Sequence, residues 1–210
     1  MAGMEVVVRS ARPEDAADGL LYLSAAPYYA AYAGGAERAR RLLAALYPLP
    51  GHTASWQVCR VAEAGGAVVG VIAAFPSSAG DALARRFVRL TLTHSPPWRL
   101  LPLMRHLRAT GAVAPEPPER MLYVDALATA TAHRRSGVAS ALLADADRMA
   151  AAAGLDGVAL DTGLENLGAR ALYERAGFTP TSLRPAPDER TARALGGSGF
   201  VGYVKRRAGR

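Results

Sequence analysis

The chain has 210 residues, half of them apolar and one-fifth charged, which is typical of a globular protein with one domain spanning 1–210. Its apolar runs are broken by Gly, Arg or Asp well before the ~20 residues that a membrane-spanning helix needs, so we expect no membrane span. The net charge of +7 suits nucleic acid or a small polyanionic cofactor, and the single Cys59 excludes an internal disulfide framework and a zinc site built on several thiolates.

The first third of the chain predicts a strand, two helices and a hairpin. The stretch "MEVVVRSA" (4–11) predicts a short strand, and 12–32 predict one helix with a proline near its first turn. A second helix is expected over 37–46, because the prolines of the following "YPLPG" cannot continue it. Two β-branched runs around "EAGGA", within 55–76, predict a hairpin.

The segment 77–119 differs in composition from its surroundings. Proline-rich pieces bracket two basic amphipathic stretches, 82–92 and 100–110, which predict two short helices inserted within the domain. Apolar residues recur at helical spacing in the second stretch: Leu100, Leu103, Met104 and Leu107. This spacing favours docking of the helix on the core, and the alternative is a lid over an acceptor site.

From residue 121 the chain alternates strands and helices. The expected elements are a strand at 121–129, a helix at 136–153, a strand at 157–162, a helix at 166–176, and strands at 178–183 and 199–207. Gly154 and Gly177 follow the two helices, where glycine commonly ends a helix. A polar loop, 184–198, separates the last two strands. The pattern predicts an α/β fold with one mixed sheet flanked by helices.

The stretch "HRRSGVASALL" (133–143) predicts an anion-binding turn. A helix beginning near Ser136 leaves its first N–H groups without internal partners, and its dipole places partial positive charge there. Gly137 lets an oxyanion approach the backbone, and Arg134 and Arg135 add countercharge. A pyrophosphate fits this description, with an ordinary helix cap as the alternative; neither the Rossmann nor the Walker glycine pattern is present.

About thirty residues later, "ENLGARALYERAGF" begins the last predicted helix. Asn166 and Tyr173 are seven residues apart, two helical turns, which aligns them on one face.

These motifs resemble the GNAT superfamily of N-acetyltransferases, which transfer an acetyl group from acetyl-CoA to an amine. The resemblance covers 121–180, the expected acetyl-CoA-binding core. The family's [Q/R]-x-x-G-x-[G/A] pyrophosphate loop is matched by Arg134, Gly137 and Ala139, and its "ALYE-x-x-GF" signature by "ALYERAGF". The resemblance implies a GNAT-like acyl-CoA N-acyltransferase fold with 77–119 as a helical insertion between strands three and four.

The resemblance also implies which residues contact acetyl-CoA. Those expected at the pyrophosphate are Arg134, Arg135, Ser136, Gly137, Val138, Ala139 and Ser140. Those expected at the pantetheine and the acetyl carbonyl are Leu127, Ala128 and Thr129. The family's Asn after the fifth strand matches Asn166, and Tyr173 is expected beside the thioester sulfur.

An amine that attacks a thioester needs a base, an oxyanion donor and a group that stabilises the departing thiolate. Because an alkyl ammonium has a pKa of about 10, a base must remove its proton, and the candidates are Asp125 and Asp161. We favour Asp125, which shares a strand face with Tyr123 and Leu127; the alternative for each acid is a hydrogen-bonded strand end. The oxyanion donor is expected to be a backbone N–H near Leu127.

Tyr173 is the candidate that stabilises the thiolate. The alternative is a buried ring whose hydroxyl already has a hydrogen-bond partner within the protein.

The sequence therefore predicts a cytoplasmic N-acetyltransferase that acts on a primary amine of a small molecule or peptide by direct attack. We expect the cytoplasm because the first residues lack a signal-peptide pattern. The four histidines lack metal-ligand spacing, so no metal is expected. The alternatives are a catalytically silent acyl-CoA-binding or sensor module and, less favoured, a nucleic-acid-binding protein. Homodimers are common in the family.

Overall fold

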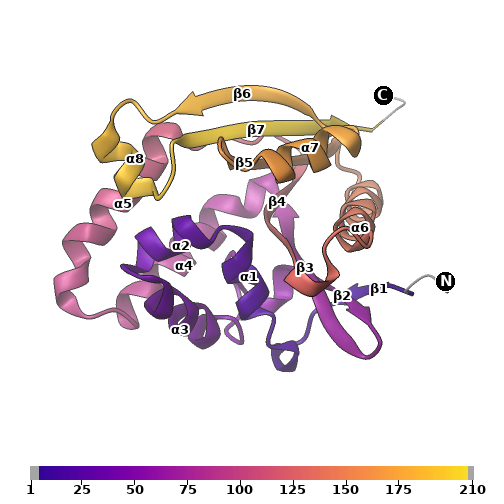
Figure 1. Ribbon diagram of the computed structural model, residues 1–210, viewed down its shortest axis with the longest axis horizontal. Coiled ribbons are helices and arrows are strands. Elements are labelled where there is room, and N and C mark those ends of the chain that lie inside the picture. Colours follow the sequence, from indigo (N-terminus) through magenta and orange to yellow (C-terminus); the bar gives the residue numbers. More distant parts are fainter. Residues whose placement is uncertain (1–4, 208–210) are drawn as a thin grey trace.

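The computed structural model describes residues 5–207 and places seven strands of that part of the chain in one mixed sheet (Figure 1). The strands are β1 (Val7–Ser10), β2 (Cys59–Ala64), β3 (Ala67–Pro76), β4 (Met121–Thr129), β5 (Gly157–Gly163), β6 (Thr179–Pro185) and β7 (Gly199–Arg206). Their order is β1-β2-β3-β4-β5-β7-β6, and only β4 and β5 are parallel neighbours among the described strands. The predicted α/β fold with a mixed sheet is confirmed.

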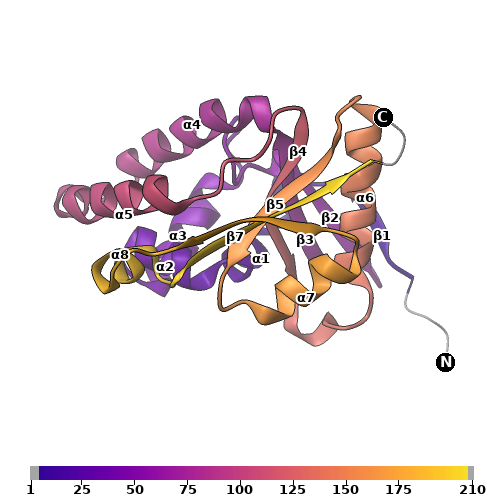
Figure 2. The same cartoon turned by 90° about the horizontal axis from the view of Figure 1, so that it is seen from above.

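Helices cover both faces of the sheet. The longer ones are α1 (Asp18–Ser24), α2 (Ala26–Ala33), α3 (Ala36–Leu46), α4 (Gly80–Thr93), α5 (Leu100–Val113), α6 (Val138–Ala152), α7 (Leu167–Arg175) and α8 (Glu189–Leu195). Short 3-10 turns lie at Pro13–Asp15, Trp56–Val58, Ser77–Ala79, Pro97–Arg99 and Thr131–His133. Figure 2 places α4, α5 and α8 at the opposite end of the molecule from α6.

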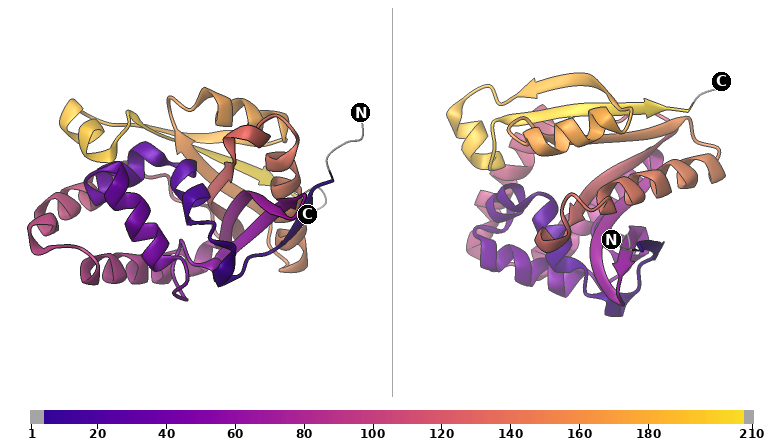
Figure 3. Two further views of the ribbon diagram at one scale, coloured as in Figure 1. Left: turned by 60° about the horizontal axis from the view of Figure 1, so that its bottom comes forward. Right: turned by 45° about the vertical axis from the view of Figure 1, so that its right-hand side comes forward.

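The sheet separates two apolar clusters. On one face, residues of α1 to α5 pack against β2, β3 and β4, and on the other, α6 and α7 pack against β2 to β5 and β7. The right-hand panel of Figure 3 shows the salmon-coloured α6 across the sheet from the indigo helices α1 to α3. Neighbouring residues of β3 show the alternation, because Val71 belongs to the first cluster and Ile72 to the second.

The predicted hairpin is confirmed as β2 and β3. Gly65 and Gly66 connect the strands with φ of 58° and 78°, a pair of left-handed conformations that glycine adopts without a Cβ penalty. Two such residues make the tight turn that matches the twist of the flanking strands.

A β-bulge interrupts β4 at Asp125. On β3, Ala73 pairs with Ala126 and Ala74 pairs with Val124, which leaves Asp125 as an extra residue. The bulge changes which face each residue meets: Val124 packs on the α6 side, and Ala126, two residues later, packs on the α1 side. The prediction that Asp125 shares one strand face with both Tyr123 and Leu127 is therefore wrong in part, because the regular alternation of β4 is interrupted at Asp125.

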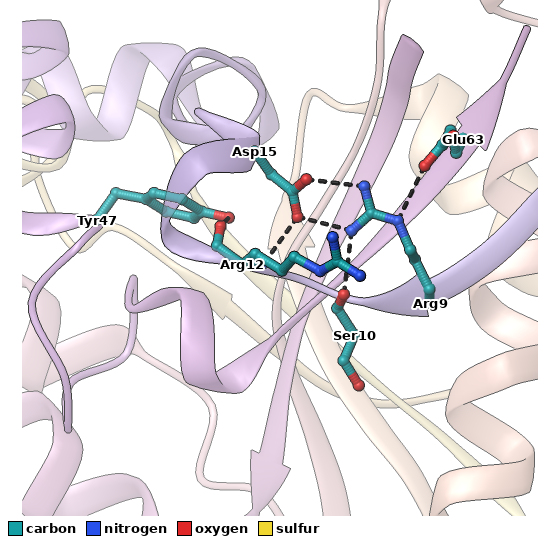
Figure 4. Close-up of polar contacts among 6 residues, drawn as sticks. All are labelled: Arg9, Ser10, Arg12, Asp15, Tyr47 and Glu63. Carbon is teal, nitrogen blue, oxygen red and sulfur yellow. Dashed lines mark hydrogen bonds and ion pairs between the residues drawn. The ribbon is translucent and has the colours of Figure 1, made fainter. Parts of the chain in front are cut away.

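A polar cluster fixes the start of the chain against the sheet (Figure 4). The Arg9 guanidinium on β1 donates to both carboxylate oxygens of Asp15, at 2.8 and 2.7 Å, and to Oε2 of Glu63 on β2 at 2.9 Å. Asp15 also accepts the N–H of Arg12 at 2.7 Å, and the Tyr47 hydroxyl donates to the Arg12 carbonyl at 3.2 Å. The cluster ties the turn that precedes α1 to the edge of the sheet.

The single helix predicted over 12–32 is wrong. This stretch forms a 3-10 turn followed by α1 and α2, with a break at Ala25, whose φ is −149°. Pro27 stands in the first turn of α2, where its missing N–H costs nothing. In one continuous helix its ring would clash with the carbonyl of Leu23, so the chain breaks just before it.

The loop predicted at 184–198 contains α8. Asp188 caps this helix by accepting the N–H of Thr191 at 2.7 Å, and Gly196 ends it with a φ of 77°. Both cap residues were visible in the sequence, but the helix has only seven residues and its apolar face is short.

The two helices predicted within 77–119 are confirmed as α4 and α5, each longer than its predicted core. The docking prediction for α5 is right for Leu103 and Leu107, which pack on the core, and wrong for Leu100 and Met104, which are 52% and 41% exposed. The two residues of each pair are four positions apart and so lie on one strip of the helix surface. The strip of Leu103 and Leu107 faces the core, and the strip of Leu100 and Met104 does not.

Candidate active site

A cavity of about 640 Å³ lies where β4 and β5 part. The last paired residues of the two strands are Val124 and Leu160, so Asp125 and Asp161 follow at the level where pairing ends. Beyond that level β3 is the one partner of β4 among the described strands, as far as Thr129. The divergence of two parallel neighbours opens the centre of the sheet.

Five of the predicted site residues line this cavity: Asp125, Leu127, Asp161, Asn166 and Tyr173. They come from β4, β5 and α7 with its N-cap, so the parting strands bring together residues that are far apart in the sequence. Ala128, Thr129 and the turn 134–140 lie outside the cavity lining.

The two aspartates line the same cavity. Asp125 is exposed within this cavity, where the surrounding protein limits its hydration; this desolvation, then the charge of Asp161, raises its pKa to about 7. Burial raises the pKa of Asp161 to about 6, while a hydrogen bond donated by the Tyr123 hydroxyl opposes the rise. Asp125 can therefore take up a proton near neutral pH, while Asp161 is held by Tyr123.

Tyr173 presents its hydroxyl to the cavity. The ring is 6% exposed and packs against Phe178 and Tyr203 at centroid distances of 6.0 and 5.8 Å. Among residues 5–207 the Tyr173 hydroxyl has no hydrogen-bond partner, whereas the neighbouring Tyr203 hydroxyl accepts from Arg170 and donates to Glu174. Burial, then the charge of Asp161, raises the pKa of the Tyr173 phenol, which keeps its proton at neutral pH.

Asn166 caps α7. Its side-chain oxygen accepts the N–H of Ala169 at 3.2 Å, and its amide nitrogen donates to the hydroxyl of Thr162 at 3.2 Å. These bonds fix the first turn of α7 against the end of β5, with Tyr173 two turns further on. Asn166 thus has a structural role in addition to its place in the cavity lining.

The predicted anion-binding turn has free backbone donors. In the described part of the chain, the N–H groups from Arg135 to Ser140 donate to no protein acceptor, and the first bond of the α6 ladder runs from Ala141 to Gly137. Arg135 and Gly137 both have positive φ, 63° and 87°. Alternating conformations of this kind turn successive N–H groups toward one concave surface, which suits an anion.

The helix start predicted at Ser136 is wrong by two residues. Gly137 is the N-cap and α6 begins at Val138, while the Ser136 hydroxyl donates to the carbonyl of His133 at 2.5 Å. Ser136 therefore stabilises the turn before the helix rather than capping the helix.

Sequence reasoning assigned no role to several residues in the cavity. Tyr123 was placed near Asp125, but its bond to Asp161 depends on the pairing of β4 with β5. Tyr28, Tyr32 and Phe87 line the far side of the cavity. The tyrosine cluster "PYYAAY" in the sequence was a signal for an aromatic surface, but not for the surface it faces.

The sequence profile described as "Acetyltransferase (GNAT) family" matches residues 28–178. The chain belongs to this family. The match covers most of the chain, including the β4–α6 turn and the α7 signature on which the resemblance rested. GNAT membership supports acetyl transfer as the general reaction. No curated protein sequence matches the chain.

Solved structures share the GNAT fold of this chain. One acetyltransferase has 20% identity and a TM-score of 0.69, covering 97% of this chain and 100% of its own. An N-acetyltransferase from Staphylococcus aureus Mu50 has 16% identity and a TM-score of 0.67, covering 94% and 98%. An agmatine N-acetyltransferase mutant in apo form has 15% identity and a TM-score of 0.61, covering 97% and 100%. At these identities the likeness shows the fold alone.

Within residues 5–207, none of the helices has the length and apolar character needed to cross a membrane. The same residues contain no group of three or more His, Cys, Asp or Glu side chains placed to hold a metal ion.

Proposed function

We propose that this GNAT protein is an acetyl-CoA-dependent N-acetyltransferase that acts on a primary amine by direct attack. The observation that carries the proposal is the cavity itself, where a carboxylate poised near neutral pH and an unpartnered tyrosine hydroxyl face the same space. A base on β4 and a proton-bearing group on α7, both lining one cavity, are what attack of an amine on a thioester needs.

The chain offers a place for each end of acetyl-CoA. The free N–H groups from Arg135 to Ser140, together with the α6 dipole, would hold the pyrophosphate, and Arg134 and Arg135 would add countercharge. Next to this turn, the buried Thr129 hydroxyl lacks a partner among the described residues, which fits a polar ligand group.

The strand edge between the turn and the cavity is also free. After Val124, β4 has no strand partner on its β5 side among the described residues, so backbone groups near Leu127 can bind the pantetheine and the acetyl carbonyl. An N–H group in this stretch is the proposed oxyanion donor. When bound, acetyl-CoA supplies a thioester carbon for the amine nitrogen, and its sulfur leaves with the bonding electron pair.

Asp125 is the proposed base. An alkyl ammonium has a pKa of about 10, so the acceptor arrives protonated and must lose a proton before attack. The pKa of Asp125, about 7, lets the group accept this proton directly or through a water molecule at neutral pH. Tyr123 holds Asp161 in place, so Asp161 acts by raising the pKa of Asp125 and by attracting the cation.

Tyr173 is proposed to stabilise the leaving sulfur. Its phenol keeps its proton and has no competing acceptor in the described structure, so it can donate a hydrogen bond to a thiolate. The reference pKa of a tyrosine is about 10 against about 8.5 for a thiol, so a hydrogen bond is favoured over full proton transfer.

Calorimetric titration with acetyl-CoA tests the cofactor site. We expect micromolar binding by the wild type and its loss in Gly137→Glu, since a carboxylate there repels phosphate. Gly154→Glu is the matched control, because Gly154 also has positive φ (64°) and open space around its Cβ position but lies at the other end of α6. Equal losses in the two variants would mean that backbone strain, and not the phosphate site, explains the effect.

Thiol release from acetyl-CoA across a panel of amines, with the acetylated product identified by mass spectrometry, tests turnover. Binding without turnover on a broad panel would favour a catalytically silent acyl-CoA-binding module.

A further inference from the structure

The cavity extends well beyond the two aspartates, toward α2, α4 and α5. Aromatic and aliphatic side chains form this far part of its wall: Tyr28, Tyr32, Phe87, Val88, Leu107 and Phe200. Five of the eight tyrosines and two of the four phenylalanines of the chain line the cavity, so its wall is far more aromatic than the chain as a whole. Most of the far wall comes from α2 and from the inserted helices α4 and α5.

The rings of this wall are held in place by contacts behind them. The Tyr32 hydroxyl donates to Thr91 at 2.9 Å, and the Thr91 hydroxyl donates to the Phe87 carbonyl at 3.0 Å. The buried His106 packs edge-on against Tyr28 and Tyr32, with centroids 4.6 and 5.2 Å apart. With the Tyr32 hydroxyl engaged, the wall offers a ligand mainly fixed, apolar ring surfaces.

The charge of the wall has one sign. Although the chain carries a net charge of +7, the described lining contains no Lys, Arg or His, and its charged residues are Asp125, Asp161 and Glu165. Glu165 is exposed, and its Oε1 accepts the N–H of Ser198 at 2.7 Å. A cation is therefore attracted to the aspartates, whereas a ligand carboxylate meets repulsion and no counterion.

We propose that the acceptor is an arylalkylamine, a primary amine joined by a short alkyl chain to an aromatic ring, with no second charge. Its ammonium group lies at Asp125, and its ring lies among Tyr28, Tyr32 and Phe87. Aromatic pairs gain energy beyond area burial in offset or edge-to-face contacts, which this wall provides on more than one side. The inference rests on the proposed function, because it assigns the acceptor of the same reaction.

A set of related amines tests this substrate class. We expect 2-phenylethylamine to be acetylated with a kcat/KM at least tenfold above that of butylamine, which lacks the ring, and of putrescine, which adds a second charge. Phenylalanine keeps the skeleton of 2-phenylethylamine and adds a carboxylate, so we expect no measurable acetylation of it. Preference for putrescine or phenylalanine would overturn the proposal while leaving N-acetyl transfer in place.

A pocket-filling variant tests the location. Ala82 and Ala84 on α4 are both exposed, but only Ala84 lines the cavity. In Ala84→Phe we expect about a tenfold higher KM for 2-phenylethylamine, with little change in the KM for ethylamine or acetyl-CoA. Ala82→Phe is the matched control and should leave all three values unchanged; equal effects of both variants would overturn the assignment of the ring to this wall.

Direct binding separates the two proposals. Calorimetric titration with 2-phenylethylamine should show binding in the wild type and weaker binding in Ala84→Phe, whether or not turnover occurs. If the wild type acetylates no amine but binds 2-phenylethylamine, the proposed function fails and the aromatic pocket stands. If it acetylates other amines and neither binds nor acetylates 2-phenylethylamine, the proposed substrate class is wrong and the proposed function stands.

Discussion

The two carboxylates at the end of β4–β5 pairing have different surroundings, and this difference separates their roles. Asp161 receives a hydrogen bond from Tyr123, whereas Asp125 has no such donor among the described residues and has the higher pKa, about 7 against about 6. Two acids in one space deprotonate in sequence, because the first charge disfavours the second. As the pH rises, Asp161 ionises first, and Asp125 becomes a base only near neutral pH.

This order predicts the pH profile of the enzyme. We expect kcat/KM for an amine to fall as the pH drops through about 7, since protonated Asp125 cannot accept the ammonium proton. In Asp125→Asn the fall in kcat/KM below pH 7 should vanish, and kcat should be lower by about 10² to 10⁴, the usual contribution of a general base. Steady-state kinetics between pH 5.5 and 9 check it, and an unchanged profile would remove Asp125 from the mechanism.

Tyr173→Phe makes a separate prediction at the residue scale. The variant keeps the ring contacts with Phe178 and Tyr203 and loses only the hydroxyl that faces the cavity. We therefore expect a kcat lower by about tenfold or more, the effect of a lost hydrogen bond of about 1.5 kcal/mol to a charged group. The Kd for acetyl-CoA should stay nearly constant in calorimetry, and wild-type turnover would refute the role.

At the scale of elements, sequence patterns predicted β4, α6, β5 and α7 nearly to their ends. These elements have strong periodicity and clear cap glycines, Gly154 and Gly177. The break at Ala25 was missed because it depends on a single residue, Pro27, and the short helix α8 was missed because it depends on the single cap Asp188. The bulge at Asp125 was also missed, since it depends on the register against β3, which lies outside the strand's own sequence.

The same limit applies to the candidate site. The turn before α6 and the pair Asn166 and Tyr173 are sequence-local patterns, so they could be predicted. The contact between Tyr123 and Asp161, and the aromatic wall from α2, α4 and α5, join segments far apart in the chain, and only the fold brings them together.

Two helix caps give a matched pair of variants. Asn166 caps α7 and lines the cavity, whereas Asp188 caps α8 in the same way and lies outside the cavity lining. Asn166→Ala should lower the free energy of unfolding by about 1 kcal/mol and also lower kcat, because Tyr173 lies on the helix that Asn166 fixes. Asp188→Ala should lower the melting temperature with a smaller effect on kcat. Equal losses of kcat would mean that the caps act only through stability.

At the scale of the whole molecule, two sets of acids act on stability with opposite signs. The hydrogen bonds from Arg9 and from the Arg12 N–H, with Arg9 the larger cause, hold the pKa of Asp15 below its usual value. Its contribution is present above the unfolded pKa, about 3.9, and is lost as the pH falls through the folded pKa. Asp125 and Asp161 have raised pKa values, so their cost grows as the pH rises from about 4 to about 7.

Thermal unfolding at several pH values tests these signs. Asp125→Asn should melt at a higher temperature than the wild type at pH 7 and at nearly the same temperature at pH 4, where Asp125 is neutral. Asp15→Asn should lose about 2 kcal/mol at pH 7, as expected for hydrogen bonds to a charged group, and less at pH 3. A destabilised Asp125→Asn at pH 7 would contradict the raised pKa of Asp125.

The bulge at Asp125 changes which residues of β4 face each side of the sheet. Leu127 packs on the side of α6, whereas Ala126 and the aromatic wall lie on the side of α1 to α5, and the gap beside β5 joins the two sides. Under the proposed function, acetyl-CoA and the amine would therefore approach from opposite faces of the sheet, and neither would have to leave before the other binds. This arrangement favours a sequential mechanism through a ternary complex over one that passes through an acetylated enzyme.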